Sequence, residues 1–275
     1  MSKLTLQSNA KVNLSLDILG REPKGPFKGY HFVQTVLHEI TPQNTHDFKS
    51  DIIHIEIEPH AEPSEPKIEI KCDHPDVPTD ETNTAYKAAR ILLEKSRPAV
   101  TSKITITIEK NIPIASGLGG ASSNAAETIK GLNQLLKLNL TPNKMQSIAA
   151  EVGMDAPFFI RGGVALAEHY GEQITTLPPI HGTAFTIFMQ GPSLTPVAEP
   201  PTPQTNKTQS QYSKIALSLC GKNIPKTEAL IHAIKTNDNL ALHKNLHNDF
   251  ETLLKEPLAK NHHLTGSGPV YFILA

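Results

Sequence analysis

The residues with the clearest chemical potential lie in one short stretch, 113–123. This stretch holds three glycines and two serines: Gly117, Gly119, Gly120, Ser122 and Ser123. Glycine adopts positive φ angles without strain and lets a ligand approach the main chain closely. Backbone N–H groups in such a turn bind anions, so the composition predicts a site for a negatively charged group such as a phosphate.

The flanking patterns predict how this stretch is positioned. Isoleucines alternate with polar residues over 103–109, which predicts a strand with one apolar face. Pro113 has no backbone N–H and ends the sheet pairing. A helical pattern then runs to Leu136, with N-cap residues expected among Ser122, Ser123 and Asn124. The unpaired N–H groups and the positive dipole end of this helix would face the anion.

Better-known nucleotide motifs do not fit the stretch. No Gly-Lys-Ser/Thr closes it, so it is not a Walker A loop, and its glycine spacing differs from Gly-x-Gly-x-x-Gly. The chain also contains no His-Arg-Asp or Asp-Phe-Gly segment of the kind found in protein kinases. A purely structural turn is the alternative that these residues leave open.

A lysine and an aspartate far apart in the chain are further candidates for chemistry. Lys11 and Asn13 share one face of an extended segment over 4–19. Asp155 stands beside two phenylalanines, where a carboxylate is expensive to desolvate unless a cation pairs with it. Lys11 is the predicted partner. Taken singly, a solvated lysine and a turn-capping aspartate are the alternative interpretations.

Several segments together resemble the GHMP kinases, the family of galactokinase, homoserine kinase and mevalonate kinase. Residues 113–123 are similar to their phosphate loop, Pro-x-x-x-Gly-Leu-Gly-Gly-x-Ser-Ser, and residues 153–159 are similar to their Gly-x-Asp-x-Pro-Phe-Phe. The glycine turn at 264–275 resembles their third motif. The Gly-Tyr-His at 29–31 resembles members that accept a cytidine diphosphate substrate, although Lys28 replaces the usual aspartate.

The resemblance implies a role for each matching residue. Lys11 and Asp155 would be catalytic. ATP, with Mg²⁺, would bind at Pro113, Ser116, Gly117, Leu118, Gly119, Gly120, Ala121, Ser122 and Ser123. The substrate would contact Asn13, Tyr30, His31 and Thr195. The implied reaction is phosphorylation of the 2-hydroxyl of cytidine diphosphate methylerythritol, in the non-mevalonate isoprenoid pathway. No residue is assigned to the metal.

The resemblance also implies an α+β, two-domain GHMP kinase fold with the active site in the cleft between the domains. Residues 1–162 would form a nucleotide domain like ribosomal protein S5 domain 2. Residues 163–275 would form a shortened, ferredoxin-like α/β sandwich. Local patterns predict strands at 51–58, 67–71 and 183–189, and helices at 82–96, 141–153, 226–235 and 240–254. The Pro-rich segment 59–66 is predicted to join the first two strands as a hairpin loop.

Composition limits the class of protein. The chain has 275 residues, 38% of them hydrophobic, and a net charge of −1. This charge gives no reason to expect binding to nucleic acid or to an anionic membrane. Cys72 and Cys220 lack metal-site spacing, and no signal-peptide or membrane-helix pattern occurs. We therefore expect a cytoplasmic enzyme that is a monomer or a homodimer.

Two other functions remain open at this stage. One is a different small-molecule GHMP kinase, of the homoserine or mevalonate type. The other is a non-catalytic nucleotide-binding relative, which the altered approach at Lys28 and the short C-terminal region would favour.

Overall fold

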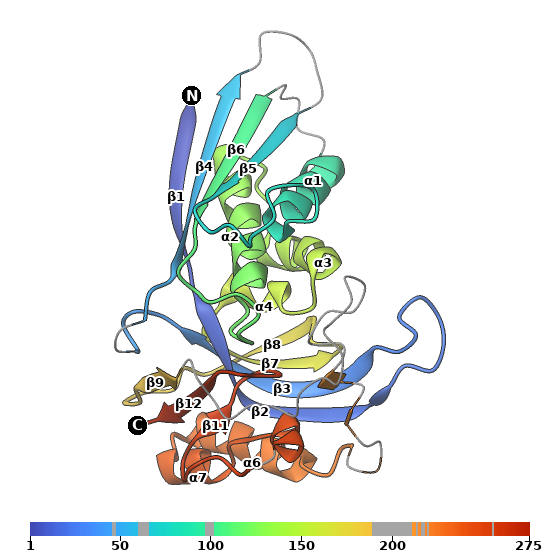
Figure 1. Ribbon diagram of the computed structural model, residues 1–275, viewed down its shortest axis with the longest axis vertical. Coiled ribbons are helices and arrows are strands. Elements are labelled where there is room, and N and C mark those ends of the chain that lie inside the picture. The colour runs from blue at the N-terminus through green and yellow to red at the C-terminus, as the bar shows by residue number, and fades with distance from the viewer. Residues whose placement is uncertain are drawn as a thin grey trace. The chain divides into compact units, whose positions relative to one another are not determined.

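The computed structural model describes residues 1–45, 48–59, 66–96, 102–188, 211–212, 214–215, 218, 220–254 and 256–275 (Figure 1). The chain forms two compact units. Unit 1 comprises Met1–Ala10, Lys49–Ile114 and Gly119–Arg161, and unit 2 comprises Lys11–Phe48, Ala115–Leu118 and Gly162–Ala275. The helices and strands confirm the predicted α+β class. The predicted domain limits, 1–162 and 163–275, stay a prediction.

Unit 1 contains a four-stranded sheet in the order β1-β4-β6-β5. Its strands are β1 (Ser2–Ser8), β4 (Asp51–Pro59), β5 (Lys67–Cys72) and β6 (Ser102–Glu109). The predicted hairpin between the segments at 51–58 and 67–71 is wrong, because β6 lies between β4 and β5 and pairs with both. Alternating isoleucines can fill either position in a sheet, so their pattern does not specify the neighbouring strand.

Helices α1 (Thr84–Ser96) and α2 (Gly120–Leu135) cover one face of this sheet (Figure 1). Helices α3 (Pro142–Val152) and α4 (Ala156–Arg161) pack against these two helices. Gly131 brings α2 close to the sheet. A Cβ at this position would contact Ile55 and would lie 2.8 Å from Leu6 Cδ1. The apolar residues of β4 and β6 that face the helices are buried, so the core of unit 1 lies between the sheet and these helices.

The observed N-terminal caps of α3 and α2 can be compared with the caps and boundaries predicted for these helices. Thr141 caps α3, since its hydroxyl accepts from Lys144 N at 3.3 Å, and Gly153 ends the helix as predicted. The predicted caps of α2 are wrong. The helix begins at Gly120 behind Gly119, whose φ is 74°. Ser123 and Asn124 lie inside the first turn and accept hydrogen bonds from the buried Ser8 hydroxyl at 2.8 and 2.7 Å.

Unit 2 contains two sheets, in the orders β10-β2-β3-β7-β8 and β11-β12-β9. The strands of the first are β2 (Ala10–Arg21), β3 (His31–Ile40), β7 (Val164–His169), β8 (Gln173–Leu177) and β10 (His247–Asn248). Those of the second are β9 (Phe185–Phe188), β11 (His263–Leu264) and β12 (Tyr271–Leu274). Helices α6 (Ile224–Thr236) and α7 (Asn239–Lys244) lie on one face of the larger sheet (Figure 1).

The predicted helix over 240–254 is wrong beyond Lys244. The chain forms β10 and then the 3-10 helix η2 (Asp249–Leu253). Asn248 donates to Leu264 O and Gly266 O, both at 2.9 Å, and its Oδ1 accepts from Phe250 N. Asp249 accepts from Ile18 N at 2.7 Å. These long-range hydrogen bonds satisfy backbone groups of other segments, so they outweigh the local helical pattern.

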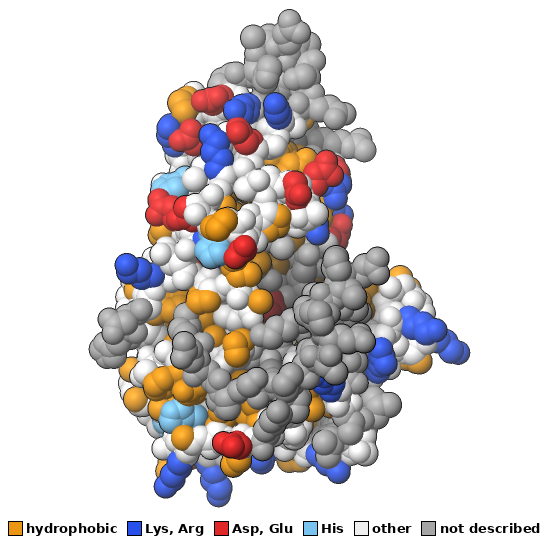
Figure 2. Space-filling model, viewed as in Figure 1, with side chains coloured by type: hydrophobic (Ala, Val, Ile, Leu, Met, Phe, Trp, Pro, Cys, Tyr) orange, Lys and Arg blue, Asp and Glu red, His pale blue; other side chains and the backbone are white. Residues whose placement is uncertain are grey.

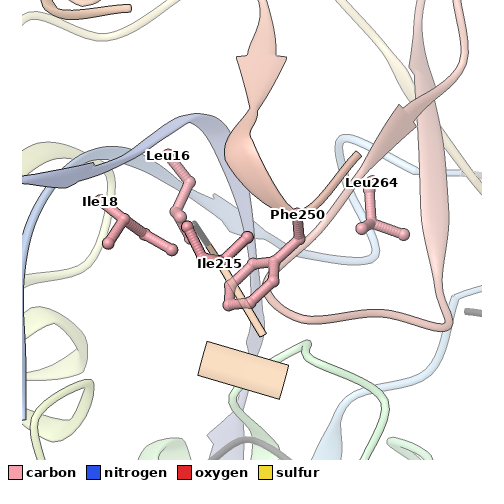
Figure 3. Close-up of a cluster of buried hydrophobic side chains, with 5 residues drawn as sticks. All are labelled: Leu16, Ile18, Ile215, Phe250 and Leu264. Atoms are coloured by element: carbon pink, nitrogen blue, oxygen red, sulfur yellow. The ribbon is translucent and has the colours of Figure 1, made fainter. Parts of the chain in front are cut away.

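A buried cluster joins β2 to the C-terminal segments of unit 2. Leu16 and Ile18 of β2 meet Phe250 of η2, Leu264 of β11 and Ile215, and Figure 3 shows these five side chains gathered together. Phe250 and Ile18 are fully buried. Deleting a large buried side chain of this kind typically destabilises a protein by about 2–5 kcal/mol. The cluster therefore fixes the strand that carries Lys11 and Asn13.

A buried polar network lies beside this cluster. His247 Nδ1 faces the Asn245 carbonyl at 2.9 Å, and Nε2 faces Asp17 Oδ1 at 3.1 Å. Thr227 Oγ1 donates to Asp17 Oδ2 at 2.5 Å. A neutral imidazole carries one N–H and an ionised carboxylate carries none, but both ring nitrogens of His247 face acceptor oxygens. The His247–Asp17 pair therefore needs one additional proton to satisfy both contacts. Burial lowers the pKa of His247, but the hydrogen bond to Asp17, the hydrogen bond to Asn245 O and the Asp17 charge outweigh burial and raise it.

Charges of both signs are interspersed on the surface. On the face drawn in Figure 2, acidic and basic side chains alternate over unit 1, in keeping with exposed pairs such as Lys3–Glu56 and Arg90–Glu94. Such pairs contribute little to stability. Within the described part of the chain, no helix is both long enough and apolar enough to cross a bilayer.

Candidate functional site: a phosphate loop and its supports

The glycine-rich stretch leaves β6, turns sharply and enters α2. Positive φ angles recur at every second residue: 53° at Ala115, 84° at Gly117 and 74° at Gly119. Alternating backbone conformations of this kind turn successive N–H groups toward one side and form an anion-binding concavity. Gly119 has no side chain that could cap the first turn of α2, which leaves the N–H groups of that turn available to a ligand.

The loop residues predicted to hold ATP differ in exposure. Pro113 and Ala121 are exposed, Ser122 is half-buried, and Ser116, Leu118 and Ser123 are buried. The Ser116 hydroxyl accepts from Leu118 N at 3.3 Å, and Ser123 belongs to the Ser8 contact. The backbone, Ser122 and the loop surface are therefore available to a ligand, whereas Ser123 supports the helix.

The tip of the loop, 115–118, belongs to unit 2. A Cβ on Gly117 would lie 2.6 Å from Thr265 O, so only glycine fits against the turn that precedes β12. Lys11 N donates to Leu118 O at 2.9 Å. Strand β2 and the Thr265 turn therefore hold the tip from two directions.

Lys11 and Asn13 are both buried within unit 2. Lys11 Nζ donates to Gly117 O at 2.7 Å and to Asn13 Oδ1 at 2.6 Å. Asn13 Oδ1 also accepts from Gly266 N at 2.9 Å, and Asn13 Nδ2 donates to Thr35 Oγ1 at 2.8 Å. The structure thus places the Lys11 ammonium at the tip of the loop and Asn13 among protein partners that hold this ammonium.

Asp155 immediately precedes α4 in unit 1 and is half-buried. Phe158 and Phe159 anchor the short helix in the core, and Lys130 Nζ of α2 donates to Phe159 O at 3.2 Å. A Cβ on Gly153 would lie 4.0 Å from Ser122 Oγ. The segment that carries Asp155 therefore packs against the start of α2. The predicted pairing of Asp155 with Lys11 stays a prediction.

Comparisons with known proteins decide the family. Residues 83–163 match the family described as GHMP kinases N terminal domain. A protein of Synechococcus sp. (strain JA-3-3Ab) named 4-diphosphocytidyl-2-C-methyl-D-erythritol kinase is 34% identical over 97% of this chain and 77% of its own length. One of the same name from Clostridium botulinum (strain Alaska E43 / Type E3) is 31% identical over 98% of this chain and 90% of its own. The chain belongs to the GHMP kinase family.

Solved structures share the fold. A 4-(cytidine 5'-diphospho)-2C-methyl-D-erythritol kinase superposes with a TM-score of 0.67 at 24% identity, covering 99% of this chain and 90% of its own. A homoserine kinase from Cytophaga hutchinsonii superposes with a TM-score of 0.68 at 16% identity, covering 100% of this chain and 85% of its own. At these identities the likeness shows the GHMP kinase fold and does not distinguish substrates.

Two of the predicted substrate residues, Tyr30 and His31, contact different aromatic side chains in this GHMP kinase. Tyr30 is 47% exposed and makes edge contacts with Phe27 and Tyr170, at centroid distances of 5.5 and 5.6 Å. His31 lies 5.0 Å from the ring of Tyr212. Burial and the Arg21 charge lower the pKa of His31, so its ring is neutral at pH 7 and presents one donor and one acceptor.

Thr195 lies outside the described residues, as does most of the segment 198–212. The contact predicted for Thr195 therefore stays a prediction. One buried feature beside the loop was not predicted from the sequence, the ion pair of Asp51 and Lys110, whose side chains are 0% and 5% exposed. An aspartate at a strand start and a lysine at a strand end carry no pattern that would have linked them.

Proposed function

We propose that this chain is an ATP-dependent kinase that phosphorylates the 2-hydroxyl of 4-diphosphocytidyl-2-C-methyl-D-erythritol, in the non-mevalonate route to isoprenoid precursors. The observation that carries the proposal is the set of relatives of that name, which are 34% identical over more than nine-tenths of this chain. Similarity of this extent includes the phosphate loop, the Asp155 segment and the Tyr30–His31 segment together.

The loop geometry supports ATP as the phosphoryl donor. Alternating positive φ angles and the N-terminus of α2 offer a polyphosphate several backbone donors and the positive end of a helix dipole. Phosphoryl transfer requires mainly positioning and stabilisation of charge, and fixed backbone dipoles supply both. The Thr84 hydroxyl donates to Ala121 O at 2.8 Å, which ties α1 to the first turn of α2 and holds these dipoles in place.

Lys11 and Asp155 have different roles in the transfer of the phosphoryl group to the alcohol. Lys11, held by Gly117 O and Asn13, carries a fixed positive charge at the loop tip that stabilises negative charge on the transferring group. Asp155 accepts the proton of the acceptor hydroxyl or orients that hydroxyl for attack. It immediately precedes α4, whose Phe158 and Phe159 are buried, and Gly153 of the same segment lies near Ser122 of α2.

Mg²⁺ fits this site as a companion of ATP. Across the described segments, no three carboxylate, imidazole or thiol side chains gather in the way that a protein metal cage requires. Mg²⁺ in kinases is commonly held by substrate phosphates with one or two protein ligands, so such a cage is not needed. When bound, the ion neutralises charge on the phosphate oxygens.

Tyr30 and His31 support a pyrimidine-bearing substrate. The exposed ring of Tyr30, braced on Phe27 and Tyr170, offers an aromatic face on which a base can stack. The neutral imidazole of His31 can both donate and accept a hydrogen bond, as the edge of a cytosine requires.

The experiment that tests the proposal is phosphoryl transfer from ATP to a panel of alcohols. The panel contains the cytidine diphosphate methylerythritol substrate, homoserine, mevalonate and phosphomevalonate. We expect transfer to the cytidine-bearing substrate with a kcat/KM at least about 100-fold above the others, because discrimination by a built polar pocket reaches this size. Faster transfer to homoserine or mevalonate would show a different GHMP kinase. ATP binding without transfer to any alcohol would show a non-catalytic relative.

A further inference from the structure

The entrance to the phosphate loop rests on the buried ion pair of Asp51 and Lys110, which the mechanism above does not use. Lys110 Nζ lies 2.7 Å from Asp51 Oδ2, and the two side chains are 5% and 0% exposed. Burying two charges costs more than their attraction returns unless further hydrogen bonds satisfy both groups. The partners of this pair therefore indicate what it holds in place.

Both charges bind the backbone at the entrance to the loop. Asp51 Oδ1 accepts from Asn111 N and Ile112 N, each at 2.7 Å. Lys110 Nζ donates to Ile112 O, and Lys110 N donates to Asp73 Oδ1 at 2.8 Å. The peptide groups between β6 and Pro113 are thus fixed by charge-assisted hydrogen bonds, which are about twice as strong as neutral ones.

The same pair also touches the exit of the loop. Gly120 is the first residue of α2. A Cβ on Gly120 would lie 3.1 Å from Lys110 Nζ and 3.0 Å from Ile112 Cγ2. The N-terminus of α2 therefore packs directly against the Lys110 ammonium group and against Ile112, whose carbonyl accepts from that group. Entrance and exit both belong to unit 1, so a single buried group sets the separation of the two ends of the loop.

We propose that Asp51 and Lys110 are positioning residues of the phosphate loop, which hold its two ends at the separation that binds the ATP phosphates. This inference rests on the proposed ATP site. The pair acts through geometry, because its opposite charges largely cancel at the distance of a bound phosphate. Loss of the pair should therefore weaken binding of the triphosphate and leave binding of the nucleoside unchanged.

The test is the double variant Asp51→Asn/Lys110→Met, in which neither buried group is left as an unpaired charge. Replacing a whole buried pair is far better tolerated than removing one partner. The dissociation constants of ATP and of adenosine are measured by calorimetry or by competition with a fluorescent nucleotide. We expect the dissociation constant of ATP to rise at least about tenfold, because small displacements of a positioning group have effects of this size. The dissociation constant of adenosine should stay within about twofold of the wild-type value.

The exposed pair Lys103–Glu69 provides a matched control. It joins β6 to β5 at 2.7 Å, with both side chains 36% exposed. The double variant Glu69→Gln/Lys103→Met likewise removes one acidic and one basic charge, here from β5 and β6, and should bind ATP within about twofold of wild type. The KM for the alcohol substrate should also stay near wild type in the Asp51/Lys110 variant, while the KM for ATP rises.

A second variant keeps the inference testable if the double variant does not fold. Gly120→Ala keeps both charged side chains but introduces a methyl group 3.1 Å from Lys110 Nζ and 3.0 Å from Ile112 Cγ2, which must shift to admit it. It should also weaken ATP binding and leave adenosine binding unchanged. ATP binding within about twofold of wild type in every folded variant, or equal weakening for ATP and adenosine, overturns the inference.

Failure of the proposed function gives a different result. If the wild-type chain transfers phosphate to another alcohol, the proposed substrate is wrong, but the ATP and adenosine measurements still decide the role of the pair. If the wild-type chain does not bind ATP, both proposals are overturned.

Discussion

Replacing Asn13 tests whether this residue holds the protein together or holds the substrate. Its Oδ1 accepts from Lys11 Nζ at 2.6 Å and from Gly266 N at 2.9 Å. Its Nδ2 donates to Thr35 Oγ1 at 2.8 Å. Asn13→Ala removes a hydrogen bond from a charged donor, worth about 1.5–3 kcal/mol, and neutral ones with Gly266 and Thr35, worth about 0.5–1.5 kcal/mol each. We therefore expect the free energy of unfolding to fall by about 2.5–6 kcal/mol, a large part of the stability of a typical domain.

The assay is urea unfolding followed by circular dichroism, compared with Asn13→Asp and Asn143→Ala. The aspartate retains an acceptor for Lys11 and Gly266 but has no donor for Thr35 Oγ1, so it should recover only the part of the loss that comes from Lys11 and Gly266. Asn143 is exposed and accepts from Arg161 Nη2 at 2.7 Å, so its replacement should change stability by no more than about 0.5 kcal/mol. If Asn13→Ala unfolds with wild-type stability while the KM for the alcohol rises, Asn13 is a substrate contact and the reasoning from its hydrogen bonds is wrong.

Three further predictions concern the loop, the proton acceptor and pH. Gly117→Ala places a Cβ 2.6 Å from Thr265 O and should raise the KM for ATP at least about tenfold; an unchanged KM would show that the loop tip does not position ATP. Asp155→Asn should lower kcat by about 10²–10⁴-fold with ATP affinity unchanged, and near-normal turnover would remove Asp155 from the mechanism. Burial lowers the pKa of His38 and of His263 to about 4, so their neutral forms stabilise the fold fully above about pH 6.5. This stability, of order 3 kcal/mol for each ring, is lost as the pH falls from about 6.5 to about 4. In His38→Asn, the urea concentration at the unfolding midpoint should therefore fall less steeply over this pH range than in the wild type.

Local patterns in the sequence were enough to predict the strands and helices that carry the site. Local patterns predicted strands that match β4 and β6 and a helix over 141–153 that matches α3. The glycine spacing correctly indicated a strand, a turn and a helix around 113–123. Each of these features depends on neighbours within a few residues, which the sequence displays directly.

The errors share one physical cause, which is competition from partners far along the chain. Ser123 is a good N-cap residue locally, yet its hydroxyl is bound by Ser8, 115 residues away. The helix expected over 240–254 ends because Asn248 and Asp249 bind backbone groups of the Gly266 turn and of β2. Asp51 and Lys110 are 59 residues apart, and their contact exists only once β4 and β6 have paired.

The buried contact between His247 and Asp17 has a calorimetric consequence. Just above the ordinary histidine pKa, an unfolded imidazole is mostly uncharged, whereas the folded chain keeps more of the extra proton between these two side chains because the pKa of His247 is raised. Melting the protein just above pH 6.5 should therefore release hydrogen ions from this pair into the medium. The heat absorbed on melting should accordingly differ between phosphate and Tris by an amount that follows the ionisation enthalpies of the two buffers.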